Sequence, residues 1–251
     1  WLTAPVSEWY GITLTADGCN IKTMDLRENN VIGELIDFNL PELTSLIFRF
    51  NQLNGSIPDF SSIPKLTFLH LSGNELTGNI PNFYNLPNLQ YLYVKNNQLS
   101  GNIPNFSNIP NLILTHLSNN QFTGNIPNFN NLPNIKVLYI SSTQITGSIP
   151  NFDNFPNIEQ LYLTGNQLTG NLPNLNQLAS LKTLRVSNNQ LSGTIPDYDN
   201  LNNLTEIRLE QNQFTFAGFE NNIQNSSLTV FLYSPQANIP IYQNGNTLHV
   251  E

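Results

Sequence analysis

The sequence predicts a solenoid, a curved right-handed coil with a concave parallel β-sheet of about ten strands and a mostly non-helical convex side. Three observations support this prediction. An asparagine recurs every 22–23 residues, an alternation of the type Leu-x-Leu precedes each copy, and prolines follow where an α-helix would otherwise continue. Because one such unit cannot bury its apolar side alone, the copies must stack on each other.

The asparagine column fixes the register of the copies. One spacing of 22 residues and seven of 23 separate its nine positions: Asn29, Asn51, Asn74, Asn97, Asn120, Thr143, Asn166, Asn189 and Asn212. An amide side chain carries both donors and an acceptor, so a stacked column can satisfy buried backbone groups where the chain bends. We therefore expect this column to be structural.

The rest of each copy divides into a strand, a turn and an extended return. Leu92 and Val94 alternate with polar or aromatic residues, which predicts a short strand with its aliphatic side chains inward. Gly101 permits the turn, and Pro104 and Pro110 exclude an α-helix after it, so the convex side should be extended or 3₁₀. We expect a second buried column there: Phe60, Phe83, Phe106, Phe129, Phe152, Leu175 and Tyr198.

The pattern predicts a single solenoid domain with three parts. Residues 1–20 form a partial N-terminal cap, residues 21–215 form nine repeats, and residues 216–251 form a terminal strand and a C-terminal cap. The last copy, with Leu228, Phe231 and Tyr233, lacks the asparagine of the others. Since the chain opens on Trp1, we expect a truncated start.

The segment Leu99–Pro104, like its counterparts, resembles the Leu-x-Gly-x-Ile-Pro signature of plant-type leucine-rich repeats, and the resemblance covers about residues 21–236. The family includes secreted bacterial surface proteins and, more distantly, polygalacturonase-inhibiting proteins and plant receptor-kinase ectodomains. It implies an extracellular or cell-surface location and binding of proteins, peptides or glycans. Plant members usually carry paired cap cysteines, whereas this chain has Cys19 alone, which favours a bacterial or algal source.

Composition excludes several other classes of function. The formal net charge of −8 argues against nucleic acid as a partner, and no apolar run approaches the ~20 residues of a membrane span. Cys19 cannot form an intrachain disulfide, and we expect it to be a small buried residue of the cap.

No serine-hydrolase, zinc-protease or phosphate-loop motif occurs. His70 and His116 lie two repeats apart, roughly 9–10 Å by strand spacing, too far to share a metal. We expect no enzymatic activity and no cofactor.

Residues between the leucines should face the concave surface, and their central row is unusual. Rings occupy five successive repeats of this row and two arginines follow. The row is Asp25, Ile47, His70, Tyr93, His116, Tyr139, Tyr162, Arg185, Arg208 and Leu232, with Phe68 and Tyr91 beside it.

Charged residues are also distributed unevenly between the concave positions and the rest of the chain. Eight of the nine cationic residues fall on predicted concave positions: Lys22, Arg27, Arg49, Lys95, Lys136, Lys182, Arg185 and Arg208. Five acidic residues share that face: Asp25, Glu28, Glu159, Glu206 and Glu210. The concave sheet is therefore +8 − 5 = +3, and the remainder of the chain is +1 − 12 = −11.

These observations predict a recognition or adhesion module whose concave face binds either a polysaccharide, including an anionic one, or a protein. Rings can contact sugars or apolar side chains, and arginine pairs with carboxylate or sulfate. The predicted ligand-binding residues are His70, Tyr91, Tyr93, His116, Tyr139, Tyr162, Arg185 and Arg208. A structural explanation competes with this one, because strands favour aromatic residues that pack across the ladder.

An alternative hypothesis is ice binding by regular polar ladders. One ladder is Thr77, Ser100, Thr123, Thr146, Thr169 and Ser192, and the other is Asn79, Asn102, Asn125, Ser148 and Asn171. Flat hydroxyl arrays on solenoids are typical of ice-binding proteins. The turn of plant-type repeats, however, commonly carries threonine or serine before its glycine.

Overall fold

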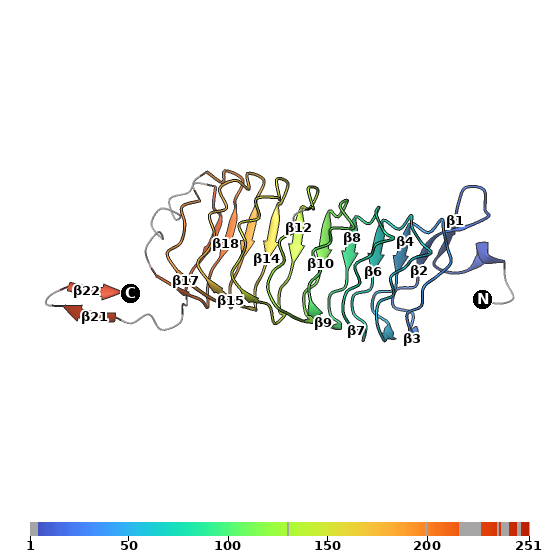
Figure 1. Ribbon diagram of the computed structural model, residues 1–251, viewed down its shortest axis with the longest axis horizontal. Helices are drawn as coiled ribbons and strands as arrows, with labels where there is room; N and C mark the ends of the chain where they lie inside the picture. The colour runs from blue at the N-terminus through green and yellow to red at the C-terminus, as the bar shows by residue number, and fades with distance from the viewer. Residues whose placement is uncertain are drawn as a thin grey trace.

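The computed structural model describes residues 5–129, 131–198, 200–215, 227–234, 236, 241–244 and 247–250. Its main feature is one long sheet, here called the concave sheet, that runs the length of the solenoid (Figure 1). Ten parallel strands build it: β2 (Ile21–Asp25), β4 (Ser45–Ile47), β6 (Phe68–His70), β8 (Tyr91–Tyr93), β10 (Leu114–His116), β12 (Val137–Tyr139), β14 (Gln160–Tyr162), β16 (Thr183–Arg185), β18 (Glu206–Arg208) and β20 (Val230–Leu232). The predicted fold class is confirmed.

The N-terminal edge of this sheet is covered by the chain itself. A 3₁₀ turn, η1 (Val6–Glu8), leads into β1 (Ile12–Leu14), which pairs antiparallel with β2. The expectation that Cys19 is buried is wrong, because Cys19 lies exposed in the loop between β1 and β2, where its thiol contacts the Asp17 carbonyl oxygen at 3.4 Å.

A second set of short strands follows the asparagine column, where the sequence indicated only turns. These strands are β3 (Ile32–Glu34), β5 (Gln52–Asn54), β7 (Thr77–Gly78), β9 (Gln98–Asn102), β11 (Gln121–Thr123), β13 (Thr146–Gly147), β15 (Gln167–Gly170), β17 (Gln190–Gly193) and β19 (Gln213–Phe214). They form three parallel blocks, β3–β5, β7–β9–β11 and β13–β15–β17–β19. They pair because stacking brings each turn beside the next, as in the 2.8 Å bond from Gln98 N on β9 to the carbonyl oxygen of Leu76, which precedes β7. Near the C-terminus, β21 (Ile241–Asn244) and β22 (Thr247–Val250) form an antiparallel hairpin.

The space between the concave sheet and the convex turns is the apolar core. Leu92, Val94 and the predicted aromatic column are buried in it. Phe83 adopts a left-handed backbone φ of 51° that turns the chain sharply, and the Leu86 amide then donates to the Phe83 carbonyl oxygen at 3.1 Å. In the described part of the convex side, such single turns replace helices, as the paired prolines predict.

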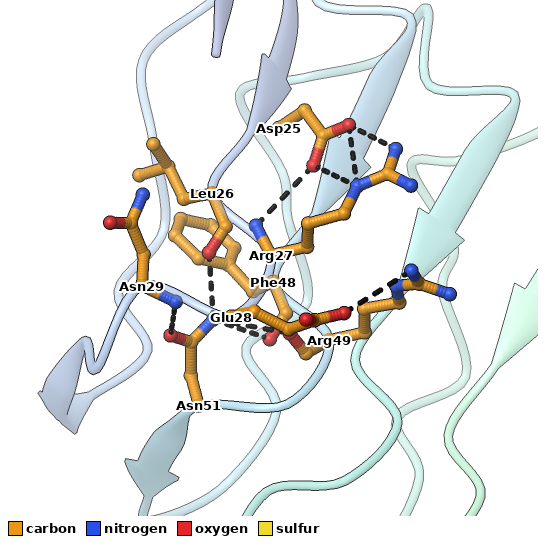
Figure 2. Close-up of polar contacts among 8 residues, drawn as sticks. All are labelled: Asp25, Leu26, Arg27, Glu28, Asn29, Phe48, Arg49 and Asn51. Atoms are coloured by element: carbon orange, nitrogen blue, oxygen red, sulfur yellow. Dashed lines mark hydrogen bonds and ion pairs between the residues drawn. The ribbon is translucent and has the colours of Figure 1, made fainter. Parts of the chain in front are cut away.

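The asparagine column is the hydrogen-bonding spine of the solenoid. The Asn51 amide nitrogen donates to the carbonyl oxygens of Leu26 at 2.8 Å and Phe48 at 2.9 Å (Figure 2). Its amide oxygen accepts from the backbone amides of Asn29 and Val31, both at 3.0 Å. The two-carbonyl arrangement recurs at Asn74, Asn97, Asn120, Asn166, Asn189 and Asn212. Each asparagine thus joins two neighbouring coils.

Two positions of this spine depart from asparagine. Thr143 has no amide, and its hydroxyl donates to the Asn166 amide oxygen instead. In the last coil, Gln236 fills the position that the sequence indicated was lost. Its amide nitrogen donates to the carbonyl oxygens of Leu209, at 3.1 Å, and Tyr233, and its oxygen accepts from the Phe214 amide at 3.2 Å.

A second asparagine ladder, which the sequence reasoning missed, runs along the convex turns. Its amide nitrogens donate to a carbonyl oxygen 24 residues earlier, for example Asn111 to Pro87 at 2.9 Å and Asn203 to Ala179 at 2.8 Å. Its signal was an asparagine before a leucine or isoleucine, in Pro-Asn-Leu or Pro-Asn-Ile triplets and in Asn202-Asn203-Leu204. Asparagine side chains therefore link neighbouring repeats by hydrogen bonds both at the spine and along the convex turns.

The spine predicts opposite effects of two matched substitutions. Asn120→Ala leaves two buried carbonyls and the Leu99 amide without their partner, so we expect a loss of about 3 kcal/mol in unfolding free energy. Thr143→Asn places an amide within reach of the Leu117 and Ile140 carbonyls, so we expect a gain of about 1 kcal/mol. Urea unfolding followed by circular dichroism measures both, and an unchanged midpoint for Asn120→Ala would contradict the structural role.

Candidate functional site on the concave sheet

The sheet register brings all eight predicted site residues onto one face. The central row runs unbroken through Asp25, Ile47, His70, Tyr93, His116, Tyr139, Tyr162, Arg185, Arg208 and Leu232, each paired with the next. From Ile47 to Arg208 the constant spacing of 23 residues produces this alignment, because every copy adds one strand without a shift. Tyr91 lies in the adjacent row, two residues before Tyr93 on β8.

The rings of the central row pack against each other. The ring centroids of His70 and Tyr93 are 4.7 Å apart, those of His116 and Tyr139 are 4.4 Å apart, and Tyr139 and Tyr162 are stacked at 4.4 Å. The intervening Tyr93–His116 pair meets edge-on at 6.4 Å. Within this row, Tyr139 and Tyr162 therefore share a stacked face, and the other neighbouring rings meet tilted or edge-on.

The arginine that follows continues the stack. The Arg185 guanidinium carbon lies 4.9 Å from the centroid of the Tyr162 ring, which is within the range of a cation–π contact. At the other end of the row, the ring of Phe68 contacts those of His70, Tyr91 and Tyr93 at centroid distances of 5.6–6.1 Å. The stack thus reaches from β6 to β16.

An apolar row accompanies the rings over four repeats. Phe68, Tyr91, Leu114 and Val137 are in register on β6, β8, β10 and β12, and all four are half-buried. After Val137 the same row turns polar, with Gln160, Thr183 and Glu206 in the next three strands. The concave surface therefore has an apolar part toward the N-terminus and a polar part toward the C-terminus.

Both histidines of the row are neutral at neutral pH. Burial, together with the charges of Arg49 and Arg27 and against the opposing charge of Asp25, lowers the pKa of His70 to about 4. Burial likewise lowers the pKa of His116 to about 4, together with Lys95 and His70. The imidazoles act here as uncharged rings between tyrosines.

The cations of the C-terminal half share two carboxylates. Glu159 binds Lys136 at 3.3 Å and Lys182 at 2.6 Å, and hydrogen bonds from these lysines, Lys182 first, lower its pKa. Glu206 binds Arg208 and also Arg185, at 3.0 Å. Each cluster combines two cations with one anion, so each has a net charge of +1.

Two of the N-terminal cations are balanced one to one. Arg27 pairs with Asp25, the last residue of β2, and Arg49 pairs with Glu28 of the preceding repeat at 3.3 Å (Figure 2).

The positive surplus of the concave positions is spread along the sheet. Lys22 and Lys95 add two positive charges to the N-terminal half, and Glu210 offsets one cation in the C-terminal half. The surplus of +3 therefore divides into +2 before β12 and +1 from β12 onward. Sequence alone showed the surplus but not the ion pairs, because these depend on which side chains the stacking makes neighbours.

One donor of the C-terminal clusters remains unused. The Arg185 Nε group is buried and has no hydrogen-bond partner among the described residues. Since Glu206 holds Nη2 of the same guanidinium, Nε is a donor that a ligand reaching this position could use.

The described residues contain no group of three metal-ligating side chains placed to hold an ion. They also include no helix long and apolar enough to cross a bilayer.

Of the two ladders considered for ice binding, the threonine and serine ladder lies on the short strands β7 to β17, and the asparagine ladder lies at or just after their ends. Both belong to a different segment of the coil from the concave row. The sequence reasoning missed a third column beside them: Gln52, Glu75, Gln98, Gln121, Gln144, Gln167, Gln190 and Gln213, all exposed. Its signal was the residue after each spine asparagine. The three columns together, with the equivalent positions Asn54, Ser56, Thr194 and Thr215 at their ends, are called the ladder face below.

Comparison with known families identifies the repeats. A profile described as Leucine Rich repeats (2 copies) matches residues 64–108 and 133–177, and one described as Leucine Rich Repeat matches residues 180–198. No curated protein matches.

Solved structures share the fold over most of this chain. The complex PEPR1–AtPEP1 is 32% identical, with a TM-score of 0.79, over 85% of this chain and 31% of that one. The Arabidopsis receptor kinase HAESA, in complex with the peptide hormone IDA and the co-receptor SERK1, is 27% identical, with a TM-score of 0.65, over 93% and 49%. A plant ice-binding protein is 28% identical, with a TM-score of 0.78, over 91% and 77%. The chain thus spans less than half of each receptor structure.

The buried histidines predict an acid-sensitive fold. An unfolded histidine titrates near pH 6.5, so below that pH the unfolded chain binds protons that the folded chain excludes until about pH 4. Stability should therefore be complete above pH 6.5 and fall toward pH 4. The double variant His70→Gln/His116→Gln should lose less stability over this interval than the wild type, as urea unfolding at several pH values would show. A parallel decline of both proteins would assign the acid sensitivity to the carboxylates instead.

Proposed function

Because the chain belongs to the plant-type leucine-rich repeat family, we propose that it is a non-enzymatic recognition module whose concave row binds an extended peptide or protein segment. The observation that carries the proposal is the unbroken row from His70 to Arg208 beside the apolar row from Phe68 to Val137. The similar HAESA structure is described as a complex with a peptide hormone, which supports it.

Ring packing favours a peptide over a polysaccharide. A sugar usually lies flat on an exposed aromatic face, but here the Tyr139 ring stacks on Tyr162 and meets the tilted ring of His116 at 4.4 Å. The rings offer edges and hydroxyls instead, and the Tyr139 hydroxyl already donates to Gln160 at 3.3 Å. Edges beside Leu114 and Val137 suit the apolar side chains of an extended chain better than a sugar ring.

Charge suggests how such a ligand would be oriented. Its apolar side chains would lie over β6 to β12, and an acidic group would lie over the net-positive clusters at Glu159 and Glu206. The unused Nε of Arg185 is one donor for that group. We place this recognition at the cell surface or outside the cell, as in the ectodomains that the chain resembles.

Removal of one ring and one cation from the row should abolish binding. We expect Tyr139→Ala/Arg185→Ala to weaken affinity roughly 100-fold or more, because both residues are central and partly desolvated. Peptides selected by the wild type from a random display library, and an array of neutral, carboxylated and sulfated glycans at two salt concentrations, supply the ligands. Titration calorimetry then compares the proteins.

The matched control removes one tyrosine and one cation from the convex side. Tyr84→Ala/Lys65→Ala changes an exposed ring and a lysine paired with Glu42, and should leave affinity unchanged. Equal binding by the Tyr139/Arg185 variant and the wild type, with both folded, would exclude the central row as the site. Selection of sulfated glycans alone, weakened by salt, would replace the peptide by an anionic polysaccharide.

The ladder face favours a second function, ice binding. Glu75 is the one charged side chain in its three columns, all of which the structure describes. Side chains repeat at about 4.8 Å between strands and about 6.7 Å along them, which makes a regular, uncharged polar grid. The similarity to a plant ice-binding protein over most of both chains supports this candidate.

Charge placed on this grid should destroy any ice activity. We expect the wild type to show thermal hysteresis and Thr123→Lys/Thr146→Lys to show none, because two ammonium groups on adjacent repeats would disrupt an ordered water layer. The concave variant Tyr139→Ala/Arg185→Ala should retain the wild-type value. Absence of thermal hysteresis in concentrated wild-type protein would remove this function.

A further inference from the structure

The asparagine column of the ladder face is held against the backbone of the following repeat. A methyl group added to Gly101, Gly124, Gly147 or Gly193 would overlap the amide oxygen of the asparagine one repeat earlier. Those asparagines are Asn79, Asn102, Asn125 and Asn171. Each amide therefore lies over a glycine that has room for it, and the glycine's left-handed φ of 72–80° suits the same position.

This packing fixes the position of exposed amides. All four asparagines are exposed to solvent, yet each amide oxygen is supported by a glycine beneath it. A supported side chain has fewer rotamers to lose when it binds a surface, so less entropy opposes binding. An amide also carries two donors and an acceptor, and a stacked column repeats them at the strand spacing of about 4.8 Å.

The neighbouring hydroxyls are fixed in a related way. Thr77 donates to the Gly55 carbonyl oxygen and Thr146 to the Gly124 carbonyl oxygen, both at 3.3 Å. Because these two hydroxyl hydrogens are used within the protein, the oxygens of Thr77 and Thr146 remain as acceptors. At these two positions a fixed acceptor therefore stands beside the amide column.

Serine interrupts the amide column at one internal position. Between Asn125 and Asn171 stands Ser148, and a methyl group added to Gly170 would meet only the Ser148 side chain, at 3.9 Å. Gly170 has a φ of 79°, like the glycines that carry an amide. The place for an amide therefore exists there and is open, so the column consists of three consecutive asparagines, a gap and a fourth.

We infer that the glycine-supported amide column of Asn79, Asn102, Asn125 and Asn171 is the element of the ladder face that binds ice, and that Ser148 limits its length. This inference rests on the second function proposed above and assigns that function to particular side chains. Substituting asparagine at position 148 completes a run of five amides, from residue 79 to residue 171, on one rigid array.

The decisive experiment is a gain of activity. Ser148→Asn should give roughly a doubling of thermal hysteresis at equal protein concentration, because contacts on one rigid array reinforce each other. The matched control is Ser107→Asn, the same change at an exposed convex turn, which should leave thermal hysteresis unchanged. Asn125→Ser gives the reverse test without risk to the fold, because serine already occupies this column at Ser56 and Ser148. It should lower activity.

The outcomes separate this inference from the function on which it rests. A wild type without thermal hysteresis overturns both. Activity that is present but unaffected by Ser148→Asn and by Asn125→Ser leaves ice binding standing and overturns the amide column as its determinant. Retention on microcrystalline cellulose without thermal hysteresis would reassign the array to a crystalline polysaccharide and also overturn the inference.

Discussion

Every other feature of this solenoid depends on the hydrogen bonds of the spine asparagines. Each coil must bend between the concave strand and the short strand that follows, and the bend leaves carbonyls such as those of Leu71 and Val94 pointing into the core. Asn97 binds both, and its oxygen accepts from the Leu76 amide of the previous coil. One side chain thus satisfies groups from two coils, which fixes the spacing at which coils stack.

A fixed spacing turns single residues into columns. When successive copies have the same length, equivalent positions lie about 4.8 Å apart along the solenoid axis and face the same side of the coil. On the concave sheet the residues at the central position vary, from His70 through Tyr139 to Arg208, and the column becomes a graded surface. On the ladder face the residues at equivalent positions hardly vary, so the columns form a regular grid. The same spine therefore supports two kinds of surface: a graded one suited to a single ligand molecule, and a regular one suited to a periodic ligand such as a crystal surface.

The sequence was sufficient for features that depend only on register. The row from His70 to Arg208 followed from counting, since 23-residue spacing leaves no freedom of alignment. It was insufficient where a side chain chooses among neighbours. Nothing in the spacing of Lys136, Glu159 and Lys182 shows that one carboxylate holds both lysines. Gln236 was missed for a related reason, because its longer side chain performs the asparagine's role at a position that the pattern had treated as degenerate.

Two departures from the repeat pattern fall in the same repeat. Thr143 lacks the spine amide, and Ser148, five residues later, lacks the ladder amide. The backbone tolerates both, because Gln144 N still donates to the Phe122 carbonyl oxygen at 2.9 Å and Thr146 N to the Gly124 carbonyl oxygen at 2.8 Å. The concave sheet also crosses this repeat without interruption, from β12 to β14. Register is therefore held by backbone pairing on both sides of the coil, and the two substitutions change only the side-chain contacts of the spine and of the ladder face.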